Sequence, residues 1–262
     1  MINILLKINL LIVFILTQQY NLIWEIKKQA DFIALDRLGF LYLYENNNLY
    51  HYNPNGKSLN IFNNRTNGKI SSFDASDPYM LLLYYKDLNR IVFLDNQLAP
   101  IGTPIDLDKY NLYQVKTVCK SKNFAVWIYD DFDNRLIHYG FNPKGITGQI
   151  NLSSLNLNNE IRFMREYGNH LYASTGKELL IFDVLGTFIQ KSPIEIPNSF
   201  QIINNKVIYY HNNQLLIYLP ELNQTDTLTL GIIKNAKNVL LTDKRIIVRK
   251  ENSVSVFSEI QP

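Results

Sequence analysis

The sequence predicts an all-β chain folded as a six-bladed β-propeller of four-stranded antiparallel blades. A short pattern recurs at intervals of 36 to 45 residues, which matches the length of such a blade. The 17 Tyr and 14 Phe residues, together with many Ile and Leu, suit strands that are packed on both faces. No segment keeps a helical period over the length of a helix.

The repeat consists of a polar turn, an apolar quartet that ends in an aromatic residue or Leu, and a second polar or glycine-containing turn. Its apolar part begins at six positions: Leu49, Ile91, Leu136, Leu179, Leu215 and Val254. A matching strand precedes each copy, so each copy is expected to form a hairpin. Further strand-like runs ahead of the hairpins are predicted to be the innermost strands: residues 32–36, 69–74, 113–120, 160–166, 199–204 and 238–243.

A fourth, outer strand follows each of the first five copies, but the sixth copy stops at Pro262 without one. A spare strand, LIWEIKK at residues 22–28, lies ahead of the first blade. We expect this strand to complete the last blade and close the ring, because closure hides edges that would otherwise pair with other chains.

The first 19 residues have the order of a secretory signal. Lys7 precedes an apolar run from Leu10 to Leu16, and cleavage is expected near Thr17 to Gln19. The run is too short for a bilayer span, and no cysteine lies near the cleavage site to carry a lipid. The sequence therefore predicts a signal peptide over 1–19 and a single propeller domain over 20–262, in a periplasmic bacterial protein without a transmembrane span in the mature chain. The alternative is a buried N-terminal strand.

Charge and motifs exclude several classes of function. With 26 basic and 23 acidic residues, the net charge of +3 is too small to indicate nucleic-acid binding. The chain lacks a glycine-rich phosphate loop, a paired-cysteine zinc pattern and HExxH. We expect Cys119 to be buried and inert, and His51 and His138, which are equivalent in the repeat, to be structural. We therefore predict a monomeric ring without a cofactor, a metal or catalytic residues.

Charged side chains mark two sides of one predicted rim, where the turns between second and third strands meet the connections between blades. An acidic sector belongs to blades two and three: Asp87, Asp106, Asp108, Asp130, Asp131 and Asp133. A basic sector lies opposite, around blades six and one: Lys27, Lys28, Arg65, Lys234 and Lys237. These residues form either ordinary solvated turns or an oriented surface for docking a protein.

The segment FDASDPYMLLLYYKDLNRIVFLDNQLAPIG, residues 73–102, is similar to a family of small exported bacterial propellers. The chain also resembles the periplasmic plug component of the type IX secretion translocon. These resemblances imply a non-enzymatic interaction scaffold, plug or assembly factor whose partner is a protein of an outer-membrane or other envelope complex.

The alternative is a hydrolase or lactonase resembling the six-bladed gluconolactonase-type propellers, which hold a divalent cation in the central channel. This alternative requires acidic or amide side chains that converge on the axis. The innermost strands offer six candidates: Asp36, Asp74, Glu160, Glu166, Asn204 and Asp243.

Overall fold

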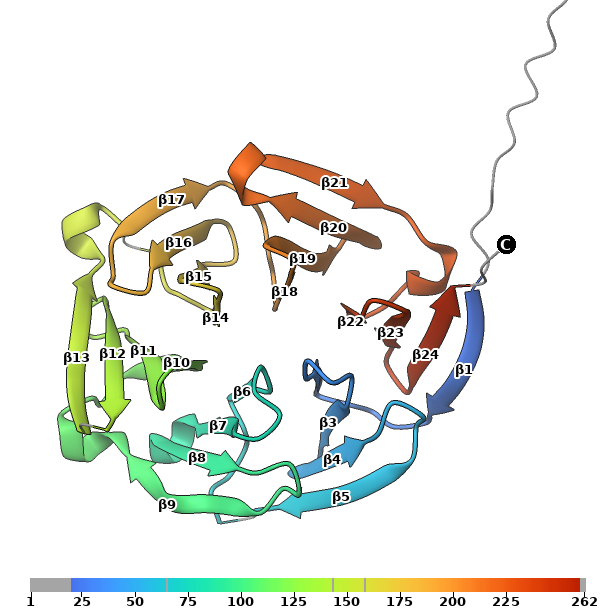
Figure 1. Cartoon of the computed structure of the whole chain (residues 1–262), viewed down its shortest axis with the longest axis horizontal. Coiled ribbons are helices and arrows are strands. Elements are labelled where there is room, and N and C mark those ends of the chain that lie inside the picture. Colours follow the sequence, from blue (N-terminus) through green and yellow to red (C-terminus); the bar gives the residue numbers. More distant parts are fainter. Residues whose placement is uncertain (1–19, 65, 143, 158, 260–262) are drawn as a thin grey trace, which may run out of the picture.

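The computed structural model describes residues 20–64, 66–142, 144–157 and 159–259, which form six four-stranded antiparallel sheets around a central axis (Figure 1). The predicted six-bladed β-propeller is therefore confirmed. The predicted signal peptide at 1–19 and Arg65 of the basic sector lie outside the described residues. In the described ranges, we find no helix with the length and hydrophobicity needed to cross a membrane.

The first three blades follow one another along the chain, each built from its inner strand outward (Figure 1). Blade 1 contains β2 (Phe32–Leu35), β3 (Leu41–Glu45), β4 (Asn48–Tyr52) and β5 (Ser58–Asn63). Blade 2 contains β6 (Ser72–Asp74), β7 (Leu81–Tyr85), β8 (Arg90–Leu94) and β9 (Pro100–Asp106). Blade 3 contains β10 (Val115–Ser121), β11 (Ala125–Asp130), β12 (Arg135–Phe141) and β13 (Lys144–Asn151).

The other three blades complete the ring. Blade 4 contains β14 (Phe163–Tyr167), β15 (His170–Ser174), β16 (Leu179–Asp183) and β17 (Phe188–Ser192). Blade 5 contains β18 (Gln201–Ile203), β19 (Lys206–His211), β20 (Gln214–Leu219) and β21 (Gln224–Leu228). Blade 6 contains β22 (Asn238–Leu241), β23 (Arg245–Arg249), β24 (Val254–Glu259) and β1 (Tyr20–Ile26). Short 3-10 turns occur in the connections: η1 (Lys86–Leu88), η2 (Leu107–Tyr110), η3 (Ser153–Leu155), η4 (Pro220–Leu222) and η5 (Gly231–Ile233).

The ring closes as the sequence predicts, because β1 pairs antiparallel with β24 as the outermost strand of blade 6 (Figure 1). The strand covers Tyr20–Ile26 rather than 22–28, since the chain leaves the sheet after Ile26 to enter blade 1. Trp24 adds a side-chain contact across the seam: its indole N–H donates to the carbonyl of Pro54 in blade 1 at 3.1 Å. Strand pairing and this contact together join the two ends of the propeller.

Apolar side chains fill the spaces between successive blades. Leu82 and Tyr84 of β7, for example, share a buried cluster with Val126 and Ile128 of β11. Because each inner sheet is covered on both faces, its strands have continuous rather than alternating apolar residues. Cys119 lies in the next cluster and is 1% exposed. Burial raises the pKa of its thiol well above the usual value, which agrees with the predicted inert role.

Asparagine is abundant because the turns require it. Of the fifteen non-glycine residues described with positive φ, thirteen are Asn, whose short polar side chain tolerates this left-handed conformation. In four blades the hydroxyl of a second-strand tyrosine donates to such a turn asparagine at 2.9 to 3.3 Å. The pairs are Tyr44–Asn47, Tyr84–Asn89, Tyr129–Asn134 and Tyr210–Asn213. This repeated bond fixes the turns between second and third strands.

Candidate functional site

The turns between second and third strands and the connections between blades lie together on one rim, which we call the connection rim. Backbone hydrogen bonds join them: Asp131 N–H donates to the carbonyl of Gln114 at 3.0 Å. Leu152 N–H donates likewise to Asn134 at 2.9 Å. The predicted gathering of these segments is therefore present, and it places the acidic sector on one side of this rim.

A cation of the same blade pairs with two carboxylates of the acidic sector. Asp130 is the last residue of β11 and is 2% exposed, so its predicted place in an accessible turn is wrong. Arg135, which directly follows the turn, contacts the Asp130 carboxylate through Nε at 3.0 Å and Nη2 at 2.9 Å. The same guanidinium lies 3.0 Å from Asp133. Asp130 therefore stabilises the turn through its ion pair with Arg135 and is not accessible to a partner.

The other carboxylates of the acidic sector have local roles or lie in solvent. Asp131 pairs with Lys116 at 3.3 Å. Asp106 accepts the N–H of Asp108 at the start of η2, and Asp108 in turn accepts a bond from the Asn89 amide at 2.6 Å. Asp87 is exposed on η1. Two cations thus offset part of the charge on the six carboxylates, and Lys116 is also shared with Glu160, so the acidic sector remains net negative.

Large apolar side chains stand exposed among these carboxylates. The exposed fractions are 40% for Leu88, 66% for Tyr113, 74% for Phe132 and 38% for Leu155. We call these four residues the rim arc, because the backbone bonds at Asn89–Leu107, Gln114–Asp131 and Asn134–Leu152 connect their turns in sequence. The sequence analysis missed the rim arc, although a phenylalanine within the polar turn DDFDN was a visible signal. Clustered exposed apolar residues are typical of interaction surfaces.

The basic sector is also partly compensated. The Lys28 ammonium lies 3.0 Å from Glu45 and 4.0 Å from the centre of the Tyr50 ring. Lys237 pairs with Glu251 at 3.0 Å. Lys27 and Lys234 are exposed. The positive charge on this side of the connection rim therefore rests mainly on two lysines in separate connections.

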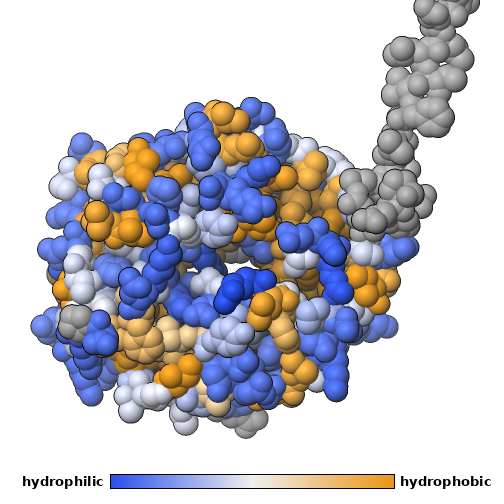
Figure 2. Space-filling model, viewed as in Figure 1, coloured by the Kyte–Doolittle hydropathy of each residue, from blue (hydrophilic) through white to orange (hydrophobic). Residues whose placement is uncertain are grey.

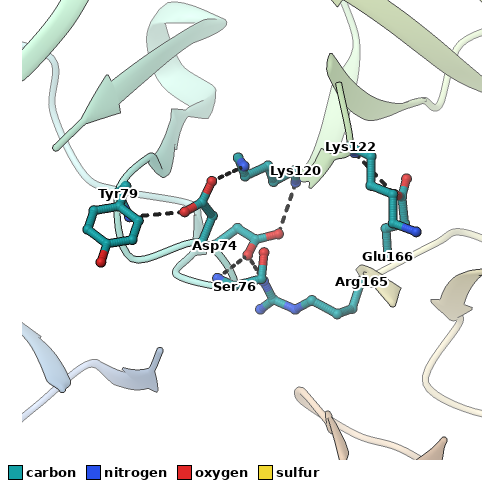
Figure 3. Close-up of polar contacts among 8 residues, drawn as sticks. Asp74, Ser76, Tyr79, Lys120, Lys122, Arg165 and Glu166 are labelled. Atoms are coloured by element: carbon teal, nitrogen blue, oxygen red, sulfur yellow. Dashed lines mark hydrogen bonds and ion pairs between the residues drawn. The ribbon is translucent and has the colours of Figure 1, made fainter. Parts of the chain in front are cut away.

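A charged cluster near the axis links blades 2, 3 and 4 (Figure 3). The Asp74 carboxylate forms an ion pair with Arg165 and accepts the backbone N–H of Lys120 at 2.9 Å. The Lys120 ammonium reaches Asp77 at 2.6 Å. Burial by itself would raise the pKa of Asp77, but the bonds from Lys120 and from the Tyr79 N–H together lower it. Hydrophilic residues also border the central opening in Figure 2.

Three of the six residues that the metal-dependent alternative offers as ligands bind protein donors instead. Asp74 is held by Arg165, and Glu166 accepts bonds from Ser121 and from the Trp127 indole. Asp36 accepts the backbone N–H groups of its own turn and the hydroxyl of Tyr42. Over the described ranges, no three His, Cys, Asp or Glu side chains group in a way that would hold a metal ion. These residues therefore do not fit the channel cation of that alternative.

The two repeat-equivalent histidines have different surroundings. His51 is 3% exposed and stacks on Tyr42 with ring centres 4.7 Å apart, and neither of its ring nitrogens has a hydrogen-bond partner among the described residues. His138 is half-buried and contacts Ser121 at 2.9 Å and Thr147 at 2.6 Å. The structural interpretation suits His51, whereas His138 belongs to a polar network that the sequence did not reveal.

Comparison with known proteins supports the fold. No protein-family model and no curated protein matches the chain. Virginiamycin B lyase from Staphylococcus aureus is similar, with a TM-score of 0.64 and 12% identity over 92% of this chain and 100% of that chain. BamB from Moraxella catarrhalis has a TM-score of 0.51 and 11% identity over 86% of this chain and 81% of that chain.

The WD40 domain of Pan2 from Neurospora crassa has a TM-score of 0.58 and 9% identity over 94% of this chain and 97% of that chain. Identities this low show a shared propeller fold alone, because one fold hosts many unrelated functions. These comparisons give no link to the type IX translocon plug.

Proposed function

We propose that the protein is an exported, periplasmic scaffold that acts without catalysis and docks an envelope protein on its connection rim. The specific form of this proposal is a plug or assembly factor for an outer-membrane complex. The observation that carries it is the rim arc, in which Tyr113 and Phe132 are 66% and 74% exposed on a rigid, hydrogen-bonded surface. Aromatic anchors of this kind supply much of the binding energy of protein interfaces.

The charged residues have a secondary role in this proposal. Asp87, Asp108, Asp131 and Asp133 surround the rim arc and form a polar border. Such a border favours one orientation of the partner and a faster encounter, while the apolar contacts supply affinity. The exposed Lys27 and Lys234 on the other side of the connection rim add a second contact of opposite sign. Charge reversal of the border should therefore weaken docking less than removal of the apolar side chains.

Affinity capture from the detergent-solubilised envelope of the native host tests this proposal. The double variant Tyr113→Ser, Phe132→Ser removes the two most exposed side chains of the rim arc. A matched control, Ile189→Ser, Leu228→Ser, removes apolar side chains that are 49% and 42% exposed on outer strands of blades 4 and 5.

We expect one envelope protein to co-purify with the wild type and the control but not with the rim variant. Recovery of the same proteins by all three would contradict docking at the rim arc. A stoichiometric divalent metal in the purified protein would instead support the hydrolase alternative.

A further inference from the structure

A hollow of about 300 Å³ lies on the opposite rim, between blade 3 and blade 4. Its walls come from β11, β12 and β13 of one blade and from the β16–β17 turn, Val184 to Gly186, of the next. Gly186 allows this arrangement: its φ is +92°, and a Cβ there would lie 2.9 Å from Ile150 of β13. Only glycine therefore lets the turn approach the neighbouring blade this closely.

Gly148 keeps the hollow open on the other side. It pairs with His138 across β12 and β13, next to an irregularity in the register between His138 and Tyr139. Such bulges change the direction of nearby side chains and are common beside functional sites. A Cβ on Gly148 would lie 3.8 Å from the Cβ of His138, which is an ordinary contact. A larger side chain at this position would thus fill space without forcing the backbone.

A hydrogen-bond chain fixes the polar groups of the hollow. The hydroxyl of Ser121 donates to Glu166 at 2.5 Å, so its contact with His138 Nε2 at 2.9 Å requires Nε2 to be the donor. Burial lowers the pKa of His138, although Glu166 acts in the opposite direction, and the ring is neutral at pH 7. Nδ1 of a neutral ring is then an acceptor. The single hydroxyl hydrogen of Thr147 bonds to Nδ1 at 2.6 Å in preference to the His138 carbonyl, which lies farther away at 3.2 Å.

These hydrogen bonds therefore leave the lone pairs of the Thr147 hydroxyl oxygen free to accept a hydrogen bond from a ligand. The exposed amides of Asn123 and Gln149 also line the hollow and provide both donors and acceptors. Apolar contact is available from Leu185, which is 89% exposed on the β16–β17 turn, whereas the Trp127 ring is only 1% exposed.

Among the described residues that line the hollow, none is Asp, Glu, Lys or Arg. A charged ligand would find no counter-ion there, which makes its transfer from water unfavourable. Amide, hydroxyl and neutral imidazole groups beside apolar surfaces suit a ligand that has many hydroxyl groups and a non-polar face. The volume is at the small end for ligand pockets, so it accommodates about one ring.

We propose that this hollow binds one neutral pyranose ring of a saccharide. The ring hydroxyls would meet Thr147, Asn123 and Gln149, and the non-polar face of the sugar would lie against Leu185. This site is separate from the rim arc, so the outcome of a sugar-binding test does not depend on whether a protein docks at the rim arc.

The protein has two tryptophans, and this allows a direct test by NMR of the indole N–H signals. The Trp127 indole donates to Glu166 beside the hollow at 2.8 Å, while the Trp24 indole donates to Pro54 at the seam. The probes are methyl glycosides of glucose, mannose, galactose and N-acetylglucosamine. Glucuronate and glucosamine serve as charged comparators.

We expect at least one neutral glycoside to shift the Trp127 signal saturably and to leave the Trp24 signal in place. The charged sugars should bind roughly tenfold or more weakly, because no counter-ion lines the hollow. No shift with any neutral glycoside, or stronger binding of a charged sugar, would overturn the proposal.

Gly148→Val should abolish the Trp127 shift, because the added side chain occupies the hollow. Gly231→Val is the matched control, since Gly231 lies on η5 with nothing within 4 Å of an added Cβ. An unchanged Trp24 signal shows that each variant is folded. A shift that persists in Gly148→Val would place binding elsewhere and contradict the proposal.

Discussion

The two rims of the propeller are built from different turns and present different kinds of surface. On the connection rim, Phe132 and Tyr113 are exposed among carboxylates, some of which pair with Arg135 and Lys116. On the opposite rim, glycines and uncharged polar side chains line a partly open hollow beside His138. An exposed apolar arc suits a protein surface, and a small, partly open hollow suits a small ligand. One repeat therefore gives two chemically distinct faces.

The rims also differ in how their buried polar groups are held. Under the connection rim, a guanidinium and a carboxylate from one hairpin form a partly buried ion pair. Near the opposite rim, Glu166 of blade 4 binds the hydroxyl of Ser121 and the indole of Trp127 in blade 3. The first contact stabilises a turn within a blade, and the second joins two blades.

The largest expected effect comes from the connection rim. Arg135→Leu leaves the 2% exposed Asp130 carboxylate without its cation, which should lower the free energy of unfolding by about 3 kcal/mol. Urea denaturation measures this change. Asp133→Asn serves as the control and should cost less than about 0.5 kcal/mol, because its side chain is 46% exposed. Equal losses of stability in the two variants would show that the Arg135–Asp130 ion pair does not stabilise the fold.

Removal of the inter-blade acceptor should have the next largest effect. Glu166→Leu leaves the Ser121 hydroxyl and the Trp127 indole N–H without their acceptor, at a cost of about 2 kcal/mol. Glu166→Gln retains a carbonyl oxygen and should recover part of this loss. The measurement is again urea denaturation. An unchanged stability in the Leu variant would mean that these donors find other partners.

Acid should destabilise the ring through its two repeat-equivalent histidines. Burial lowers the pKa of both His51 and His138 in the folded protein, whereas unfolded histidine titrates near 6.5. The unfolded chain therefore binds more protons, so stability is full above about pH 6.5 and falls as the pH decreases toward the folded-state pKa values. Unfolding free energies across this range measure the slope. His51→Phe retains a ring against Tyr42 and should make the slope shallower; an unaltered slope would exclude His51 as a cause.

The smallest expected effect concerns the exposed rim arc. Phe132→Ser should change the free energy of unfolding by less than about 0.5 kcal/mol, because the side chain is 74% exposed. Thermal and urea unfolding check this value. A large loss of stability would show that Phe132 is a structural residue and would remove it from the proposed docking surface.

The sequence predicts the blades and the ring closure because both depend on local patterns. Apolar quartets between polar turns determine the strands, and the missing outer strand after Val254 matches the spare strand at β1. Side-chain partners are harder to predict. Glu166 and Ser121 are 45 residues apart and meet only when blades 3 and 4 pack together.

The spacing of residues in the sequence also does not show which residues near a turn are buried and which are exposed. Asp130 and Phe132 are two positions apart, yet one is buried under the turn and the other projects into solvent. Asp130 still belongs to β11, whose residues are all buried, whereas Phe132 lies in the turn that follows, so the exposure of each side chain depends on where β11 ends. The sequence could therefore locate the polar rim but not separate its accessible residues from its supporting ones.

Photo-crosslinking in the native host tests the proposed docking function most directly. A photoreactive phenylalanine analogue replaces Phe132 on the connection rim or, as the control, Leu185 on the opposite rim, where the side chains are 74% and 89% exposed. We predict a discrete crosslinked adduct with an envelope protein from position 132 and none with that protein from position 185. The absence of an adduct at position 132, or the same adduct from both positions, would contradict docking on the connection rim.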